Sequence, residues 1–349
     1  MNDSARVLEV SDLRVDARTS GGSRVPLLRG VSFSLDKGEA VAIVGESGSG
    51  KSMTCAAIMR LLPSPALQLS AGSVKLEGED LLTKSERDLQ RIRGRRMAMV
   101  VQDSLAALNP VLRVGHQIDE SLRYHSSLGR EQRRTREIEL FRDVGIPAPQ
   151  ERLGDYPHQF SGGMRQRVVA AIALAVEPAL IIADEPTTAL DPTVAVRVLG
   201  MLARTRAEHG SALLFVSHDI GLARRLCTRI IVMYGGRVIE DASTSDIVDQ
   251  PLHPYTTALM SCLPSPDLEP GTKLAEISGE PPTPQALLRP GCSFAARCPL
   301  ADDRCVTQDP PVLAPAPGRR VECWKPGQLV GGNDILLRVR ETSDSGAST

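Results

Sequence analysis

The residues best suited to chemistry form one short loop, Gly45–Ser52, which reads GESGSGKS. The loop fits the pattern G-x-x-x-x-G-K-S/T, in which glycines let successive backbone N–H groups point at nucleotide phosphates. Lys51 supplies a positive charge for the outer phosphates, and the Ser52 hydroxyl can ligate Mg²⁺. We therefore predict a nucleotide-phosphate site that uses every residue of the loop: Gly45, Glu46, Ser47, Gly48, Ser49, Gly50, Lys51 and Ser52.

Two carboxylates follow a second apolar run, Leu180–Ala183, which has the character of a buried strand. Ligands of α/β sheets bind at the carboxyl ends of the strands, where Asp184 and Glu185 would lie. We predict that Asp184 holds Mg²⁺, directly or through water, and that Glu185 acts as general base toward an attacking water. A solvated acidic turn is the alternative.

A third segment, Ser161–Arg167, places glycines at the expected start of a helix. The N-terminus of a helix favours an anion, because its backbone N–H groups are free and the helix dipole is positive there. The segment therefore predicts a second phosphate-binding position. An ordinary serine N-cap is the alternative.

The elements that must position these loops alternate between strands and helices. The run Ala40–Val44 leads into the phosphate loop, and a helix is expected to begin near Lys51, which is the context that the loop pattern requires. Strands that alternate with helices form a parallel sheet, so the fold class is α/β. Short strands with turns are expected up to about residue 78, and a helical insertion at about residues 104–176. Further strands are predicted at Leu180–Ala183, Ala212–Val216 and Arg229–Met233.

Size and charge narrow the class of protein. A chain of 349 residues predicts one large domain with a smaller one, or two medium domains. The formal net charge of −1 gives no support to a nucleic-acid partner. The longest apolar run, Val168–Val176, is shorter than the ~20 residues that span a bilayer, and no signal-peptide pattern is present. We therefore expect a cytoplasmic protein whose cysteines are thiols or metal ligands.

Six motifs in a fixed order then carry a resemblance: the phosphate loop, Gln102 after a strand, SGGMRQR at Ser161–Arg167, Asp184-Glu185, Ala189-Leu190-Asp191, and Ser217-His218-Asp219. Together they resemble the ATP-binding cassette of an ABC transporter, over about residues 6–262. The resemblance implies a P-loop NTPase with a RecA-like core, an antiparallel β subdomain and a helical subdomain. It also implies that ATP and Mg²⁺ bind.

The resemblance assigns roles to these residues. Gln102 would touch Mg²⁺ and water, so that Glu185, His218 and Gln102 form the catalytic set. Asp191 would lie in a loop at the interface between two cassettes, which sandwich two ATP molecules. The signature residues would contact ATP held by the opposite cassette; they are Ser161, Gly162, Gly163, Met164 and Gln166. One departure is the adenine site, where the family usually has an aromatic residue: Phe33 is the only aromatic before Gly45 and belongs to an apparent core strand.

Finer motifs resemble the peptide-importer branch, which serves dipeptides, oligopeptides and nickel. They are Leu108-Asn109-Pro110 after Gln102, Tyr156–Phe160 before the signature, and His253–Thr256. The implied partners are a second cassette (a homologous subunit or a second copy), two transmembrane permease subunits and an extracytoplasmic substrate-binding protein. The chain would then act at the cytoplasmic face of the inner membrane. Uptake of nickel, a glycan or an antimicrobial peptide is an alternative, and a non-transport ABC ATPase is a more distant one.

The cassette is expected to span residues 1–263, followed by an extension at 264–330 and a disordered tail at 331–349. Cys292, Cys298, Cys305 and Cys323 are separated by five, six and seventeen residues within that extension. Four thiolates satisfy one four-coordinate site, although the C-x-x-C pairs that zinc sites favour are absent. The family resemblance implies a four-iron four-sulfur cluster at this position. Zinc and plain buried thiols are the alternatives.

Overall fold

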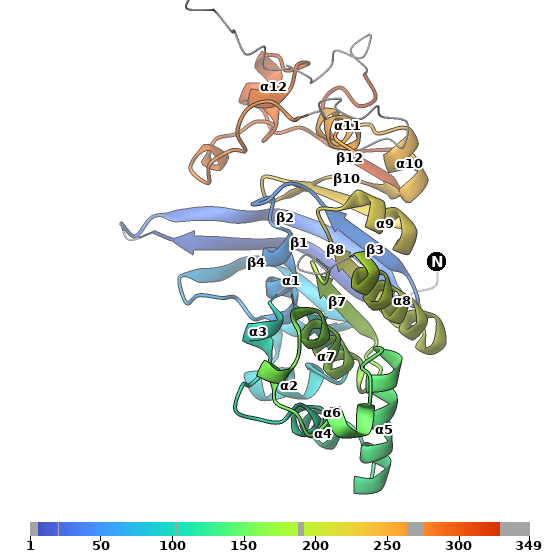
Figure 1. The fold of residues 1–349 in the computed structure, drawn as a ribbon. Coiled ribbons are helices and arrows are strands. Elements are labelled where there is room, and N and C mark those ends of the chain that lie inside the picture. Colours follow the sequence, from blue (N-terminus) through green and yellow to red (C-terminus); the bar gives the residue numbers. More distant parts are fainter. Residues whose placement is uncertain (1–5, 20, 102, 188–191, 264–275, 329–349) are drawn as a thin grey trace, which may run out of the picture. The chain divides into compact units, whose positions relative to one another are not determined.

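The computed structural model describes residues 6–19, 21–101, 103–187, 192–263 and 276–328. Contacts between residues divide the chain into two compact units, Met1–Val238 and Ile239–Thr349, which are called unit 1 and unit 2 below and are described separately (Figure 1). Among the described residues, no helix combines the length and the apolar character needed to cross a membrane.

A parallel sheet forms the centre of unit 1, with the strand order β9-β3-β8-β7-β6. The predicted apolar runs form four of these strands: β3 (Ala40–Val44), β7 (Leu180–Asp184), β8 (Ala212–Val216) and β9 (Arg229–Tyr234). β6 (Met97–Val100) pairs in parallel with β7 at the sheet edge. β3, β7 and β8 are buried at every residue, as expected for strands of a parallel sheet that is covered on both faces. Their parallel pairing brings the carboxyl ends of these strands to one edge.

An antiparallel sheet lies against this core, with the strand order β2-β1-β4-β5 (Figure 1). Its strands are β1 (Arg6–Arg18), β2 (Arg24–Asp36), β4 (Leu67–Leu76) and β5 (Glu79–Asp80). Leu28 of β2 and Ile58 of helix α1 (Lys51–Met59) belong to the same hydrophobic cluster as Leu214 of β8. This shared cluster holds α1, and with it the phosphate loop, between the two sheets.

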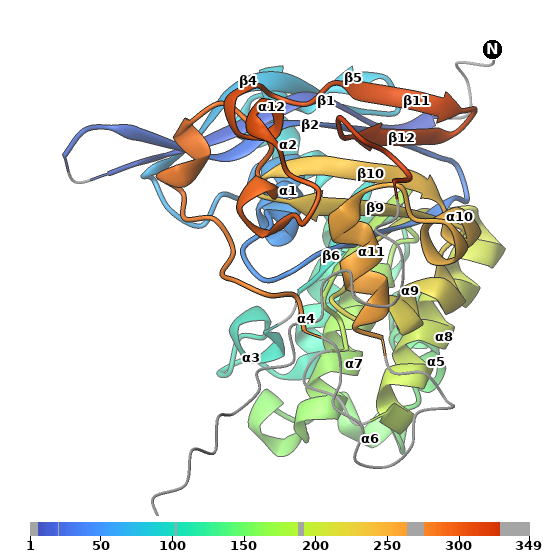
Figure 2. The ribbon, with the colours of Figure 1, turned by 90° about the horizontal axis from the view of Figure 1, so that it is seen from above.

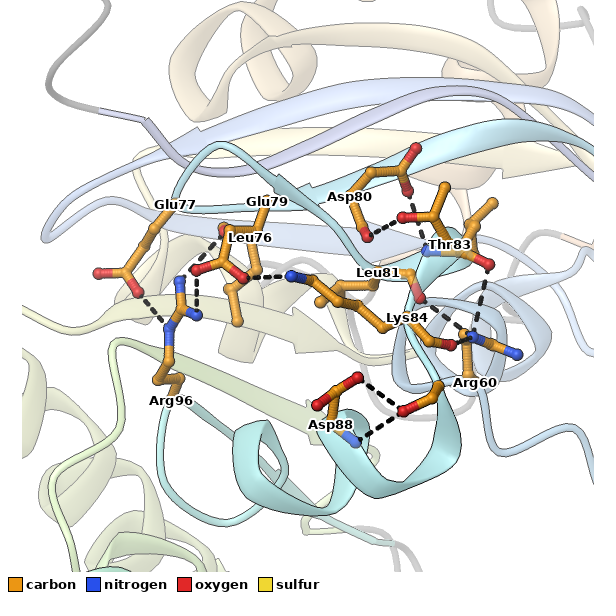
Figure 3. A network of polar contacts seen from close by, with 12 residues as sticks. Arg60, Leu76, Glu77, Glu79, Asp80, Leu81, Thr83, Lys84, Asp88 and Arg96 are labelled. Carbon is orange, nitrogen blue, oxygen red and sulfur yellow. Dashed lines mark hydrogen bonds and ion pairs between the residues drawn. The ribbon is translucent and has the colours of Figure 1, made fainter.

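A charged network joins the antiparallel sheet to the segment before β6 (Figure 3). The Arg96 guanidinium donates to the carboxylates of Glu77 and Glu79 at 2.8 Å, and Lys84 contacts Glu79 at the same distance. Hydrogen bonds from Lys84 and Arg96 lower the pKa of the Glu79 carboxyl. Each exposed ion pair contributes little to the free energy of folding. Together, these pairs fix the position of β6 and of α2 (Glu86–Ile92) against the antiparallel sheet.

A group of helices continues unit 1 and appears in green in Figure 1. Its members are α3 (Ser104–Ala107), α4 (Val114–His125), α5 (Arg130–Asp143), α6 (Pro149–Arg152) and α7 (Gly162–Leu174). Phe141 is fully buried and meets Phe160 edge to face, with 6.4 Å between ring centroids. The helical insertion predicted at about residues 104–176 covers these helices. Two further helices, α8 (Pro192–His209) and α9 (Ile220–Leu226), complete the unit.

Unit 2 is small and contains an antiparallel sheet in the order β10-β12-β11 (Figure 2). β10 (Arg237–Ser243), of which all but two residues belong to unit 2, pairs with β12 (Arg319–Glu322), and β12 pairs with β11 (Val312–Ala316). The helices are α10 (Thr244–Asp249), α11 (Pro254–Ser261) and α12 (Asp303–Thr307). Tyr255 and Phe294, both fully buried, pack edge to face at 5.3 Å and form the apolar centre.

We expect Phe141→Ala to destabilise the helical group by about 3–5 kcal/mol, because a buried aromatic ring is replaced by a cavity. Native-state hydrogen exchange in α5 measures this as a loss of opening free energy. Tyr124→Ala is the matched control, since the side chain of Tyr124 is 76% exposed and its loss should change the free energy by no more than about 0.5 kcal/mol. Equal exchange rates in both variants would contradict this packing.

Candidate functional site

The phosphate loop connects β3 to α1 and uses glycines where no other residue fits. Gly45 has a φ of 149°, and a Cβ there would lie 2.3 Å from the carbonyl oxygen of Met233. Gly50 has a φ of 107° and closes the loop at the N-terminus of α1. Ser49 Oγ is buried and has no hydrogen-bond partner among the described residues. An unpaired buried hydroxyl inside a loop of this shape fits a phosphate oxygen as its acceptor.

Lys51 lies within the loop and not in solvent. The residue is 5% exposed, and its Nζ donates to the carbonyl oxygens of Gly45 at 2.8 Å and Glu46 at 3.0 Å. Burial lowers the pKa of the Lys51 ammonium, while the carboxylates of Glu185 and Asp184 raise it. The side chain is therefore held in place before any phosphate arrives, with its charge directed into the loop.

Ser52 and Asp184 are 132 positions apart in sequence and meet at the sheet edge. Ser52 Oγ donates to Asp184 Oδ1 at 3.0 Å. Asp184 is 7% exposed; burial raises the pKa of its carboxyl, and the hydrogen bond from Ser52 lowers it. A hydroxyl and a carboxylate oxygen in contact are the hard donors that Mg²⁺ takes from a protein. Two of the three residues predicted from sequence at the magnesium ion, Ser52 and Asp184, thus lie together.

Glu185 and His218 form a second pair at the same edge. His218 Nδ1 lies 3.4 Å from Glu185 Oε2, and the backbone N–H of Glu185 donates to the Val216 carbonyl at 3.0 Å. Glu185 has a φ of 46°, which is uncommon for a residue with a side chain. Such strain at the end of a buried strand is typical of functional sites, and here it turns the carboxylate toward His218.

The predicted signature begins helix α7. Ser161 is the N-cap residue, and its Oγ accepts a hydrogen bond from the N–H of Met164 at 3.3 Å. The serine N-cap, given above as the alternative interpretation, is therefore present. Ser161 and Gly162 are also exposed at the N-terminus of the helix. Gln166 differs from these residues: it is 4% exposed, and its Nε2 donates to the carbonyl oxygen of Val101 at 3.0 Å. Its side chain thus holds the residue before Gln102, a role that the sequence did not indicate.

Two predicted residues, Gln102 and Asp191, lie outside the described residues. Phe33 is 4% exposed and belongs to the main hydrophobic cluster, which confirms its place in a core strand.

The cysteines of the extension share one pocket of unit 2. Cys292, Cys298, Cys305 and Cys323 all line it, together with His253 and Lys325. Burial raises the pKa of the Cys292 thiol to about 12, and burial also raises the pKa of Cys298 and of Cys323. Backbone N–H groups of Phe294, Leu300 and Lys325 act in the opposite direction, toward the thiolates. In the described part of the chain, no three His, Cys, Asp or Glu side chains are arranged to hold a metal ion.

His253 is the polar side chain of this pocket that sequence patterns could not place. It is 1% exposed and caps helix α11, where its Nδ1 accepts from the N–H of Tyr255 at 3.0 Å. Its own backbone N–H donates to Glu240 Oε2 at 2.9 Å. Burial lowers the pKa of His253 to about 3, so the ring is neutral. Only the motif His253–Thr256 signalled this segment, and it gave no reason for burial.

Comparisons with known proteins agree with this geometry. Residues 28–188 match the family described as ABC transporter, and residues 239–305 match the family described as oligopeptide/dipeptide transporter, C-terminal region. The oligopeptide transport ATP-binding protein OppD of Bacillus subtilis is 42% identical over 91% of this chain and 88% of its own. AppD and the dipeptide transport protein DppD of the same organism are 45% and 42% identical, over 86% and 91% of this chain and 91% and 94% of their own.

Solved structures show the same fold. The ATP-binding cassette MJ0796, described as a dimer in a post-hydrolysis state bound to ADP and phosphate, superimposes with a TM-score of 0.61. It is 28% identical, and the match covers 68% of this chain and 98% of that cassette. The predicted α/β cassette fold is therefore confirmed. The chain belongs to the ABC transporter family, in the branch of ATP-binding proteins of oligopeptide and dipeptide transport.

Proposed function

We propose that this chain hydrolyses ATP to drive the import of oligopeptides or dipeptides. One observation carries the enzymatic part: Lys51, the Ser52–Asp184 pair and the Glu185–His218 pair all lie at the loop and strand ends of one sheet edge. The names of OppD, AppD and DppD, at 42–45% identity over most of the chain, support the peptide cargo. The match of residues 239–305 to the transporter C-terminal region supports the same cargo.

Each residue of the site has a part in this reaction. The loop N–H groups and Lys51 would bind the phosphates, and Ser49 Oγ would gain its missing acceptor. Ser52 and Asp184 would hold Mg²⁺, which supplies positive charge next to the transferred phosphoryl group. Glu185 would take the proton of the attacking water while the water oxygen bonds to the γ-phosphorus and the bond from that phosphorus to ADP breaks. His218, in contact with Glu185, would orient that carboxylate and contact the γ-phosphate.

A pair of cassettes completes the site in this proposal. The exposed N-terminus of α7 offers Ser161, Gly162, Gly163 and Met164 to the ATP of a partner cassette. The dimeric cassette MJ0796 supports this arrangement. We propose that Gln102 and Asp191 act at the magnesium ion and at the cassette interface. Two permease subunits and a substrate-binding protein would complete the transporter, so that the chain works at the cytoplasmic face of the membrane.

We also propose that Cys292, Cys298, Cys305 and Cys323 hold a four-iron four-sulfur cluster. The support is that four thiols share one pocket: burial raises the pKa of Cys292 and of Cys323, and backbone N–H groups offset part of that shift toward the thiolates. Zinc at about 2.3 Å from each sulfur needs sulfur atoms ~3.8 Å apart. A cluster in which each iron takes one thiolate separates the ligands further. When bound, it would link the chain segments of unit 2 as a structural group.

Glu185→Gln should keep ATP binding and lower turnover by about 10²–10⁴-fold, because the amide cannot accept the proton of water. Steady-state phosphate release and equilibrium nucleotide binding measure the two effects. Glu177→Gln is the matched control: Glu177 also has a positive φ, of 54°, but lies at the other end of β7 in contact with Arg136. Turnover near the wild-type rate in Glu185→Gln would refute its role as base.

Cys298→Ser should lower both the iron content of the protein and the free energy of opening of unit 2, because one thiolate ligand and the link it forms are lost. Iron and sulfide analysis of anaerobically purified protein measures the first effect. Hydrogen exchange in unit 2 measures the second. Cys262→Ser is the control, because Cys262 is half-buried in unit 2 and is not among the residues that line the pocket. Unchanged iron would contradict the ligand role, and lost iron with unchanged protection would contradict the structural role.

A further inference from the structure

His253 lines the cysteine pocket and carries a buried N–H group without a partner among the described residues. The Tyr255 N–H donates to Nδ1 of His253 at 3.0 Å, so Nδ1 carries a lone pair and the proton of the neutral ring is on Nε2. Nε2 is buried and has no hydrogen-bond partner among the described residues. A buried donor without an acceptor destabilises the folded state, so its presence needs an explanation.

Helix capping does not supply that explanation. The cap of α11 uses Nδ1 alone, and an Asn, Asp or Ser residue provides the same acceptor without placing an N–H group at the position of Nε2. His253 lines the same pocket as the four cysteine thiols. An acceptor held by those thiols would satisfy the Nε2–H group, and sulfur atoms are such acceptors.

The ring is held firmly in this position. Glu240 is fully buried, and its carboxylate accepts hydrogen bonds from the N–H groups of Leu252 at 2.8 Å and His253 at 2.9 Å. The Phe294 ring lies 6.0 Å from the imidazole, centroid to centroid. Backbone, cap and packing thus fix the direction of Nε2 independently of any bound group.

We propose that Nε2–H of His253 donates a hydrogen bond to a sulfur atom of the group held by the four cysteines and thereby raises its reduction potential. The inference rests on the proposed iron–sulfur cluster. One-electron reduction adds a negative charge to such a cluster, and a fixed N–H donor stabilises the more negative state. His253 is thus a tuning residue and not an iron ligand.

Two substitutions separate the donor from the cap. Asn at position 253 keeps an acceptor for the Tyr255 N–H and removes the Nε2 donor. Gln places an amide N–H near the position of Nε2 and gives up the short cap. The midpoint potential of each full-length variant, reconstituted anaerobically with iron and sulfide, is followed by electron paramagnetic resonance. Iron and sulfide content and ATP binding are measured on the same samples.

At a fixed solution potential, we expect His253→Asn to lower the ratio of reduced to oxidised cluster by up to about tenfold. That ratio corresponds to a 59 mV lower midpoint potential for a one-electron couple. His253→Gln should stay closer to the wild-type potential. An unchanged potential in His253→Asn, or equal shifts in both variants, would overturn the proposal while leaving the cluster in place. A wild-type chain without iron and sulfide would overturn the cluster proposal and this inference together, and the metal analysis identifies that case.

A measurement on the unsubstituted chain tests the proposal even if a variant fails to fold. Pulsed electron paramagnetic resonance of the reduced cluster in protein labelled with ¹⁵N-histidine detects nitrogen close to the cluster. The chain has six histidines, and among the described residues His253 is the one that lines the cysteine pocket. A weak ¹⁵N coupling is expected, and its absence would overturn the proposal.

Discussion

The phosphate loop can function only at the carboxyl end of a fully buried strand, and the rest of unit 1 depends on that constraint. Gly45 turns so close to the Met233 carbonyl that a Cβ would lie 2.3 Å from it. Lys51 then folds back onto the loop carbonyls, which holds its charge at the centre. Parallel pairing brings β7 to the same edge, so that Asp184 meets Ser52 at 3.0 Å. One register therefore brings together the Lys51 ammonium, the Ser52–Asp184 pair and the Glu185 carboxylate.

Unit 2 uses burial for a different purpose. Its apolar centre is small, formed around Tyr255 and Phe294, yet it surrounds the fully buried Glu240 and the nearly buried His253. Buried polar groups are costly unless they are paired, and most of these are paired with backbone N–H groups. Exceptions among the described residues of this unit include His253 Nε2 and Arg319 Nε. A unit with so little apolar core would gain stability from a group that crosslinks its loops, which is the role proposed for the cluster.

Sequence patterns predicted what depends on local chemistry. The run Leu180–Ala183 forms a strand because it is apolar throughout, and the carboxylates after it reach the sheet edge for the same reason. Short strands are expected in the N-terminal part of the chain, whereas β1 runs for 13 residues to Arg18, because β2 and β4 pair along its polar half. The contact of Gln166 with Val101 and the burial of His253 depend on segments 65 and 13 positions away. No local pattern encodes those contacts.

In the proposed function, ATP hydrolysis by this chain moves peptides across a membrane. The most direct measurement is uptake of a labelled oligopeptide into proteoliposomes that contain the chain with its co-purified permease subunits and binding protein, with ATP on the side of the chain. We expect uptake that needs ATP and Mg²⁺, and hydrolysis that rises when the binding protein carries peptide. Hydrolysis that ignores peptide, with no accumulation inside the vesicles, would contradict it.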